Sequence, residues 1–390
     1  MRTRTGAMAL ICVLLMLTVA SAQKTLTPPA AKPEVERPKV EVVFVLDATG
    51  SMSGLIQAAK EKIWAIANTL VSAKPTPRIK MGLVGYRDRK DAYVTKVTPL
   101  TSDLDAVYKE LMGFQAQGGG DTPESVNQAL SEAVTLMQWS TDPKTYRVIF
   151  LVGDSPPHMD YADDVKYPVT CERAAKAGII INTIQCGSRR TTTPVWQEIA
   201  LKAEGRYFRV EQSGGAILAS TPFDTGLAKL AAELDKTRVY YGARAEREKL
   251  EKKIDVAGAI EESASSSAKA RRAEYYGKDA EGKAFGRNEL NADVAAGRVK
   301  LDELKTEELP EKMQKMTPEE RRKFVAENIA RRKALQAQIK KLSEQRQAHI
   351  RKEIAKRADG GKGALGQKVY DTIKAQAAKK GIEYENGPSH

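Results

Sequence analysis

The strongest constraint on the fold is an alternation of strand-like and helix-like segments between about residues 40 and 238. Short runs rich in Val, Ile, Phe or Tyr predict strands at 40–46, 79–86, 92–97, 146–152, 179–184 and 206–210. Helical periods lie between them, at 55–70, 104–114, 123–138, 170–177 and 194–203. This alternation predicts an α/β fold with a doubly wound, mainly parallel sheet and helices on both faces. Because ligands of such sheets bind outside the carboxyl ends of the strands, the residues that follow each strand are the candidates for a site.

Polar residues stand at these strand ends. Asp47, Thr49 and Ser51 alternate directly after the first predicted strand, and Asp154 follows the fourth. Thr122 lies between them in sequence, in a glycine-rich loop that leads into a helix. Two carboxylates and three hydroxyls make a set of hard oxygen ligands. Such a set suits Mg²⁺, or Mn²⁺ and Ca²⁺, better than zinc.

These three segments resemble the metal-ion-dependent adhesion site of the von Willebrand factor type A domain. In that family an Asp-x-Ser-x-Ser segment, a Thr and an Asp on three separate loops bind the metal. The match falls on Asp47, Thr49, Ser51, Thr122 and Asp154, with Thr49 in place of the usual Ser. The resemblance implies that one coordination position stays open for an acidic side chain of a protein partner.

The resemblance covers residues 40–236. The segments 85–88, 118–124 and 153–158 are also similar to a bacterial and alpha-kinase-associated branch of the family. Three matching loops in the right order, each after the right element, are a much more specific signal than one Asp-x-Thr-x-Ser segment alone.

The glycine-rich loop has a second interpretation. Asp121 or Thr122 would cap the following helix, because Pro123 suits a first helical position and Asp121 and Glu124 stand at capping-box spacing. Capping by Asp121 is compatible with a ligand role for Thr122.

Two further pairs of residues near the strand ends are candidates for function. Ser155 and His158 suggest a hydrolase, but two prolines separate them and no strand-to-helix nucleophile elbow is visible, so we expect no enzyme. Arg87 and Asp88 predict a structural ion pair, with contact to a partner as the alternative.

Two cysteines lie within the predicted α/β region. Cys171 begins a helix, and Cys186 follows the end of the next strand. Because that helix runs antiparallel to the strand, both sulfurs are expected at the same sheet edge. We therefore predict a disulfide, with two buried thiols as the alternative.

The N-terminal residues have the features of an export signal. Residues 1–22 combine two early arginines, an apolar run at 7–20 and a small-x-small pattern that predicts cleavage after Ala22. The alternative is an uncleaved anchor, but the run is shorter than the roughly 20 residues that a membrane span needs. We expect a secreted or periplasmic protein whose residues 23–39, rich in Pro, Lys and Glu, form a linker.

The charge is concentrated toward the C-terminus. The chain has a formal net charge of +13, yet residues 23–238 carry 27 Lys and Arg against 25 Asp and Glu, whereas residues 239–390 carry 34 against 25. Residues 237–390 are rich in Glu, Lys, Arg, Ala and Gln and are predicted to form a mostly α-helical charged arm.

Several helices are expected in this arm. A capping box at Thr317 predicts a long helix over about 318–357, and further helices are predicted at 238–253 and 364–380. Residues 263–268 have the composition of flexible chain. A broken apolar stripe on the long helix favours packing within the molecule or in a helical hairpin, with a dimeric coiled coil as the alternative.

We expect from these features an exported, non-enzymatic protein that captures an acidic residue of a protein ligand through a divalent metal. One alternative is a structural envelope protein whose basic arm contacts anionic polymer, and another is a metal-assisted hydrolase. Nucleic-acid binding is not expected, because the arm has no recognised reading motif and few aromatic residues. The sequence does not indicate the oligomeric state.

Overall fold

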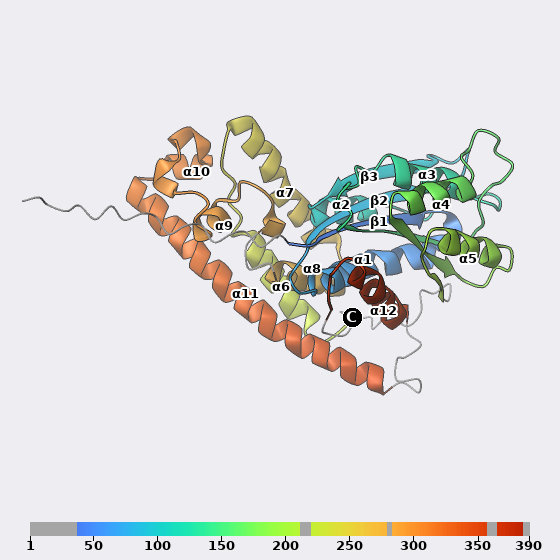
Figure 1. Cartoon of the computed structure of the whole chain (residues 1–390). Coiled ribbons are helices and arrows are strands. Elements are labelled where there is room, and N and C mark those ends of the chain that lie inside the picture. Colours follow the sequence, from blue (N-terminus) through green and yellow to red (C-terminus); the bar gives the residue numbers. More distant parts are fainter. Residues whose placement is uncertain (1–36, 211–219, 279–282, 357–364, 385–390) are drawn as a thin grey trace, which may run out of the picture. The chain divides into compact units, whose positions relative to one another are not determined.

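The computed structural model describes residues 37–210, 220–278, 283–356 and 365–384, whose arrangement Figure 1 shows. The predicted export signal lies outside these residues, and so does nearly all of the predicted linker. No helix among the described residues combines the length and the apolar character needed to cross a membrane. The six strands are β1 (Lys39–Asp47), β2 (Arg78–Tyr86), β3 (Thr95–Thr101), β4 (Tyr146–Gly153), β5 (Ile179–Cys186) and β6 (Tyr207–Val210).

The strands form one sheet in the order β3-β2-β1-β4-β5-β6. β3 runs antiparallel to β2 at the edge, and the other neighbours are parallel. The predicted α/β fold with a mainly parallel sheet is thus confirmed. The order reverses direction between β1 and β4, which is the position where sheets of this kind hold their ligands.

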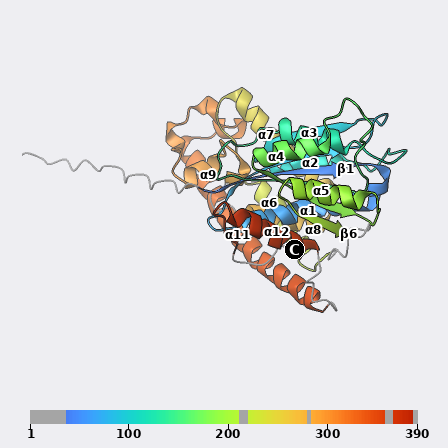
Figure 2. The same ribbon diagram turned by 45° about the vertical axis from the view of Figure 1, so that its right-hand side comes forward.

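Helices cover both faces of the sheet, as Figures 1 and 2 show. Val43 and Val45 of β1 belong to a core with α3 (Val126–Thr135), α4 (Tyr167–Lys176) and α5 (Thr192–Lys202). Val42 and Phe44 point to the other face and pack with α1 (Ser53–Val71) and α2 (Leu104–Gly113). Both β1 faces are buried because apolar side chains occupy successive positions of the strand.

The second of these cores continues far beyond residue 236. It also contains buried side chains from the C-terminal helices α6 (Asp224–Asp235), α7 (Arg244–Ser263), α8 (Ser266–Gly277), α11 (Pro318–Ala355) and α12 (Leu365–Ala378). On α12, Gln376 accepts a hydrogen bond from the Tyr146 hydroxyl (2.7 Å) and exchanges two with Asn182, so this helix is docked on β4 and β5. The described residues from Arg37 onward therefore form one compact unit, in which the helical region packs against the α/β region on both sides of the expected boundary near residue 236.

The long charged helix was predicted almost to the residue. α11 spans Pro318–Ala355, and Thr317 and Glu320 exchange the expected capping-box hydrogen bonds. Its apolar stripe packs within the molecule, since Leu335, Ile339 and Ile350 are buried. The prediction of flexible chain at 263–268 is wrong, because α8 begins at Ser266 and the Ser265 hydroxyl caps it. This run of small residues is therefore the boundary between α7 and α8.

The short helices α9 (Leu290–Ala295) and α10 (Glu311–Gln314) complete the C-terminal region. Leu290 and Met313 from these helices share a small core with Leu309 and with Val325 of α11. The first part of the long helix is thus held by its own local packing.

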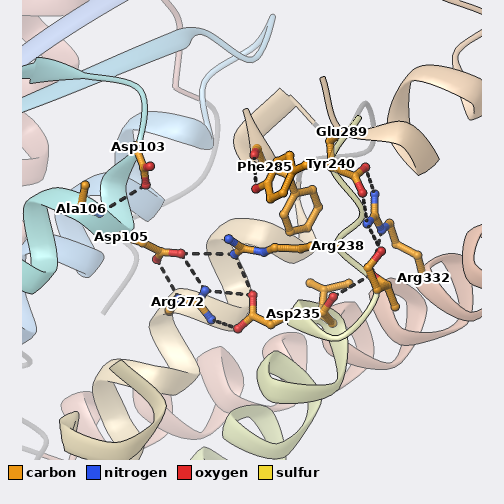
Figure 3. Close-up of polar contacts among 12 residues, drawn as sticks. Asp103, Asp105, Ala106, Asp235, Arg238, Tyr240, Arg272, Phe285, Glu289 and Arg332 are labelled. Carbon is orange, nitrogen blue, oxygen red and sulfur yellow. Dashed lines mark hydrogen bonds and ion pairs between the residues drawn. The ribbon is translucent and has the colours of Figure 1, made fainter. Parts of the chain in front are cut away.

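A buried ion network joins the C-terminal helices to α2, as Figure 3 shows. Asp105 is fully buried and accepts two hydrogen bonds from Arg272 of α8, at 2.8 and 2.7 Å, and one from Arg238 at 3.2 Å. Both arginines also pair with Asp235 at the end of α6. Burial alone would raise the pKa of Asp105, but the two guanidinium groups outweigh that effect and lower it to about 2.

We predict that Asp105→Ala destabilises the protein strongly, because it leaves two buried arginines with only Asp235 between them. The expected loss is about 3–5 kcal/mol, the usual cost of breaking a buried ion pair. Urea unfolding, monitored by circular dichroism, measures this loss of stability. The matched control is Glu248→Ala, which removes an exposed pair with Arg244 and should leave the midpoint nearly unchanged. Equal midpoints for the two variants would contradict a structural role for the network.

Candidate metal centre

The two predicted aspartates meet at the reversal point of the sheet. Asp47 is the last residue of β1, and Asp154 follows the last residue of β4. The two strands are parallel neighbours, with Leu46 opposite Val152. Both aspartates are buried, and their charges repel one another across the strand ends.

The segment after β1 folds around one oxygen of Asp47. Asp47 Oδ1 accepts hydrogen bonds from the Thr49 amide (2.9 Å) and the Thr49 hydroxyl (2.6 Å), which makes a local turn closed by the side chain. The Ser51 hydroxyl lies 3.2 Å from that of Thr49. Asp47 Oδ2 is also buried but has no hydrogen-bond partner. A buried carboxylate oxygen without a partner is costly, and a cation is the ligand that would satisfy it.

A third carboxylate comes from the glycine-rich loop. Glu124 is 2% exposed, and its Oε2 atom likewise lacks a hydrogen-bond partner. The loop approaches the β1 turn closely: a methyl group at Gly119, where φ is +72°, would lie 2.9 Å from Thr49 Cβ and 3.0 Å from Glu124 Oε1. Only glycine fits there without a shift of its neighbours.

The electrostatics of the site call for a positive charge. Burial, with a smaller contribution from Asp154, raises the pKa of Asp47 from 3.8 to about 7. Burial also raises the pKa of Glu124 from 4.5 to about 9, and repulsion from Asp47 adds to it. The residues present therefore fit a hard divalent cation, which Asp47 and the hydroxyls of Thr49 and Ser51 would hold, with the charges of Asp154 and Glu124 nearby.

Sequence reasoning missed Glu124 because it was interpreted as part of a capping box. α3 begins at Val126 rather than at Pro123, and its N-cap residue Ser125 makes no side-chain cap bond. The Glu124 amide donates instead to Pro156 O, and the Glu124 carbonyl accepts from the His158 amide, both at 3.0 Å. This pairing with the loop after β4 turns Glu124 inward. Thr122 is exposed on the same loop, and its role as a ligand stays a prediction.

The predicted disulfide is not formed. Cys171 and Cys186 are both free and buried. Cys171 packs in the core beneath α4, whereas the Cys186 side chain belongs to the core on the opposite face of the sheet. Side chains of a strand point alternately to its two faces, so a position near the same sheet edge does not bring Cys186 to the face that α4 covers.

The other predicted pairings also differ. Arg87 donates to the carbonyls of Ala48 and Gln115, whereas Asp88 accepts from the hydroxyls of Ser125 and Tyr161, so the two neighbours have separate partners. The expected Arg87–Asp88 ion pair is replaced by these contacts.

The hydrolase alternative gains no geometric support. Ser155 is 1% exposed, and its hydroxyl donates to Asp154 Oδ1 at 3.0 Å. The His158 ring faces Asp160 and Asp88. Serine and histidine are thus engaged by different carboxylates.

Comparison with known proteins finds similarity within the α/β region. Residues 41–221 match the family model of the von Willebrand factor A domain. An ariadne-like RING finger protein, R811 of Acanthamoeba polyphaga mimivirus, is 28% identical over 119 residues. That alignment covers 30% of this chain and only 11% of the viral protein.

Solved structures with partial similarity include proximal thread matrix protein 1 from the mussel byssus, at a TM-score of 0.36 and 16% identity, covering 45% of this chain and 42% of that one. The SpRpn10 VWA domain aligns at a TM-score of 0.35 and 15% identity, over 45% of this chain and 89% of that one. Scores this low do not bear on the metal or the ligand of this chain.

We predict that Mg²⁺ stabilises the protein more at high pH than at low pH. The raised pKa values of Asp47 and Glu124 mean that the folded state binds more protons than the unfolded state between about pH 4 and pH 9, so metal-free stability falls as pH rises through that window. Mg²⁺ binds the deprotonated carboxylates and relieves their repulsion. The rise in Tm with saturating Mg²⁺ should therefore be larger at about pH 8.5 than at about pH 6. A shift that is the same at both pH values would contradict this site.

We also predict that Glu124→Gln raises the Tm of the metal-free protein at neutral pH, because it removes a buried carboxyl group whose raised pKa makes the protein take up a proton on folding. The same change should weaken Mg²⁺ binding in calorimetric titration. Thr122→Ala, two residues away, is the matched variant: if Thr122 is a ligand it weakens binding without raising the metal-free Tm. If both variants keep the original Mg²⁺ affinity, the glycine-rich loop does not contribute to the site.

Proposed function

Because residues 41–221 match the family model of the von Willebrand factor A domain, we propose that this chain is a non-enzymatic binding protein that captures an acidic side chain of a protein ligand through a divalent cation. The observation that carries the proposal is the buried, unpartnered Oδ2 atom of Asp47 beside the charges of Asp154 and Glu124. Mg²⁺ is the ion that this donor set suits best, with Mn²⁺ and Ca²⁺ as substitutes.

The residues of the site have different roles. Asp47 is held by the amide and hydroxyl of Thr49, so its free oxygen keeps one direction. The Ser155 hydroxyl donates a hydrogen bond to Asp154 Oδ1 and helps to hold that side chain. When bound, the cation supplies an electrophilic position for an acidic oxygen of the partner. Pre-oriented ligands reduce the entropy that binding would otherwise cost.

We propose further that the protein is exported, on the basis of the signal-like residues 1–22. The alternative of an envelope protein whose basic region contacts anionic polymer is weakened by how the C-terminal arginines are used. Arg272, Arg332 and Arg346 are all buried in ion pairs with acidic residues of this chain. Their charges are therefore not presented to a polymer.

An array of short peptides, each with a single Glu and paired with its Gln twin, tests the function. We expect the full chain to bind a subset of the Glu peptides in the presence of Mg²⁺. EDTA should abolish this binding, and the peptides with Gln in place of Glu should not bind. Asp47→Ala should abolish binding while the circular dichroism spectrum is unchanged. The control Glu248→Ala should bind like the original protein. Binding that survives both EDTA and Asp47→Ala would refute the metal bridge.

A further inference from the structure

A second group of potential metal ligands lies beside the oxygen site. Asp88 follows β2, Asp121 lies on the glycine-rich loop, and His158 lies on the loop after β4. One ligand atom from each comes within 4.8 Å of the others. We propose that these three residues form a separate site for a transition-metal ion of the Zn²⁺ class. This inference does not rest on the proposed binding of acidic ligands.

The orientation of His158 is the first support. Its Nδ1 atom lies 2.8 Å from the Asp160 carboxylate, and its ring stacks on Tyr161 with centroids 4.0 Å apart and planes 12° from parallel. A carboxylate on Nδ1 favours the tautomer with the proton there and the lone pair on Nε2. Carboxylate–histidine–metal arrangements in proteins are built in this way.

The free nitrogen is the second support. His158 is 6% exposed, and its Nε2 atom has no hydrogen-bond partner although it is buried. It lies 3.4 Å from Asp88 Oδ2, too long and poorly directed for a hydrogen bond but within range of an ion pair if the ring is protonated. Two ligands of a tetrahedral zinc ion, at the usual zinc–nitrogen and zinc–oxygen distances, are also about 3.4 Å apart. The separation thus matches that of two atoms sharing one ion.

The surroundings of Asp88 hold it in place for this role. Asp88 is 4% exposed, and its oxygens accept hydrogen bonds from Ser125 Oγ (2.7 Å) and Tyr161 Oη (2.8 Å). A carboxylate oxygen retains further acceptor capacity after one such bond. Asp121 is exposed and closes the group from the solvent side. An ion held there would have protein ligands on one side and water on the other, as open zinc sites do.

This proposed site differs from the neighbouring oxygen site in the types of donor atom that it offers. The oxygen site offers carboxylates and hydroxyls, which favour Mg²⁺, whereas an imidazole nitrogen favours zinc and related ions. Excess Mg²⁺ should therefore fill the oxygen site and leave the histidine site open for zinc.

The test is a titration of the full chain with Zn²⁺ in excess Mg²⁺, followed through the imidazole ¹⁵N resonances. The sequence has only 3 His, so His158 is readily distinguished from His349 and His390 by its absence in His158→Gln. We expect the His158 Nε2 resonance to shift at one equivalent of zinc and the other two to stay unchanged. Asp160→Asn should weaken zinc binding by about 10–100-fold, the usual effect of losing a partner of a ligating histidine.

Asp121→Asn is the variant least able to disturb the fold, because Asp121 is exposed, and it should also weaken zinc binding. Asp163→Asn is its matched control: this exposed acid pairs with Arg89 outside the group and should keep the original affinity. The proposal is overturned if zinc leaves the His158 resonance in place, which would mean a simple imidazolium–carboxylate pair. It is equally overturned if His158→Gln and Asp121→Asn both bind zinc like the unchanged protein.

Discussion

The pairing of buried acids with arginines decides how this chain is organised. Asp105 and Glu289 are buried, and each is matched by guanidinium groups: Arg272 and Arg238 for the first, Arg332 for the second. Asp47 and Glu124 are equally buried, yet no Arg or Lys in the part of the chain that the structure describes forms an ion pair with either. Fixing a carboxylate in low dielectric without a countercharge is unfavourable. The fold nevertheless places Asp47 and Glu124 in this situation at one sheet edge, and that edge is where an external cation would complete the charge balance.

The sheet and its loops were predictable because they depend on local patterns. β-branched runs and helical periods identify the strands and helices, and parallel strands bring their carboxyl ends to one edge whatever the rest of the chain does. Asp47 and Asp154 could therefore be placed together from sequence. Glu124 could not, because its inward turn depends on backbone pairing with the loop after β4, and that contact has no signature in the local sequence.

The helical character of the C-terminal region was predictable, but the burial of its arginines was not, for a related reason. Several arginines are buried and neutralised by acids distant in sequence, such as Asp105 with Arg272, and charges counted along the chain do not show this. Their long side chains pack against aromatic rings as well: Arg332 lies over Phe285 at 4.6 Å and Arg238 over Tyr276 at 5.0 Å. Net charge describes composition, whereas burial depends on which acids the fold brings opposite each base.

The two proposed metal sites share the same loops, because one short segment contributes to both. The Glu124 side chain points to the oxygen site, while its carbonyl accepts a hydrogen bond from the His158 amide, and the next residue, Ser125, holds Asp88. A short stretch of backbone thus positions ligands of both groups. Since the donors differ, oxygens alone on one side and a nitrogen with oxygens on the other, selection between metals follows from chemistry that neighbouring residues already fix.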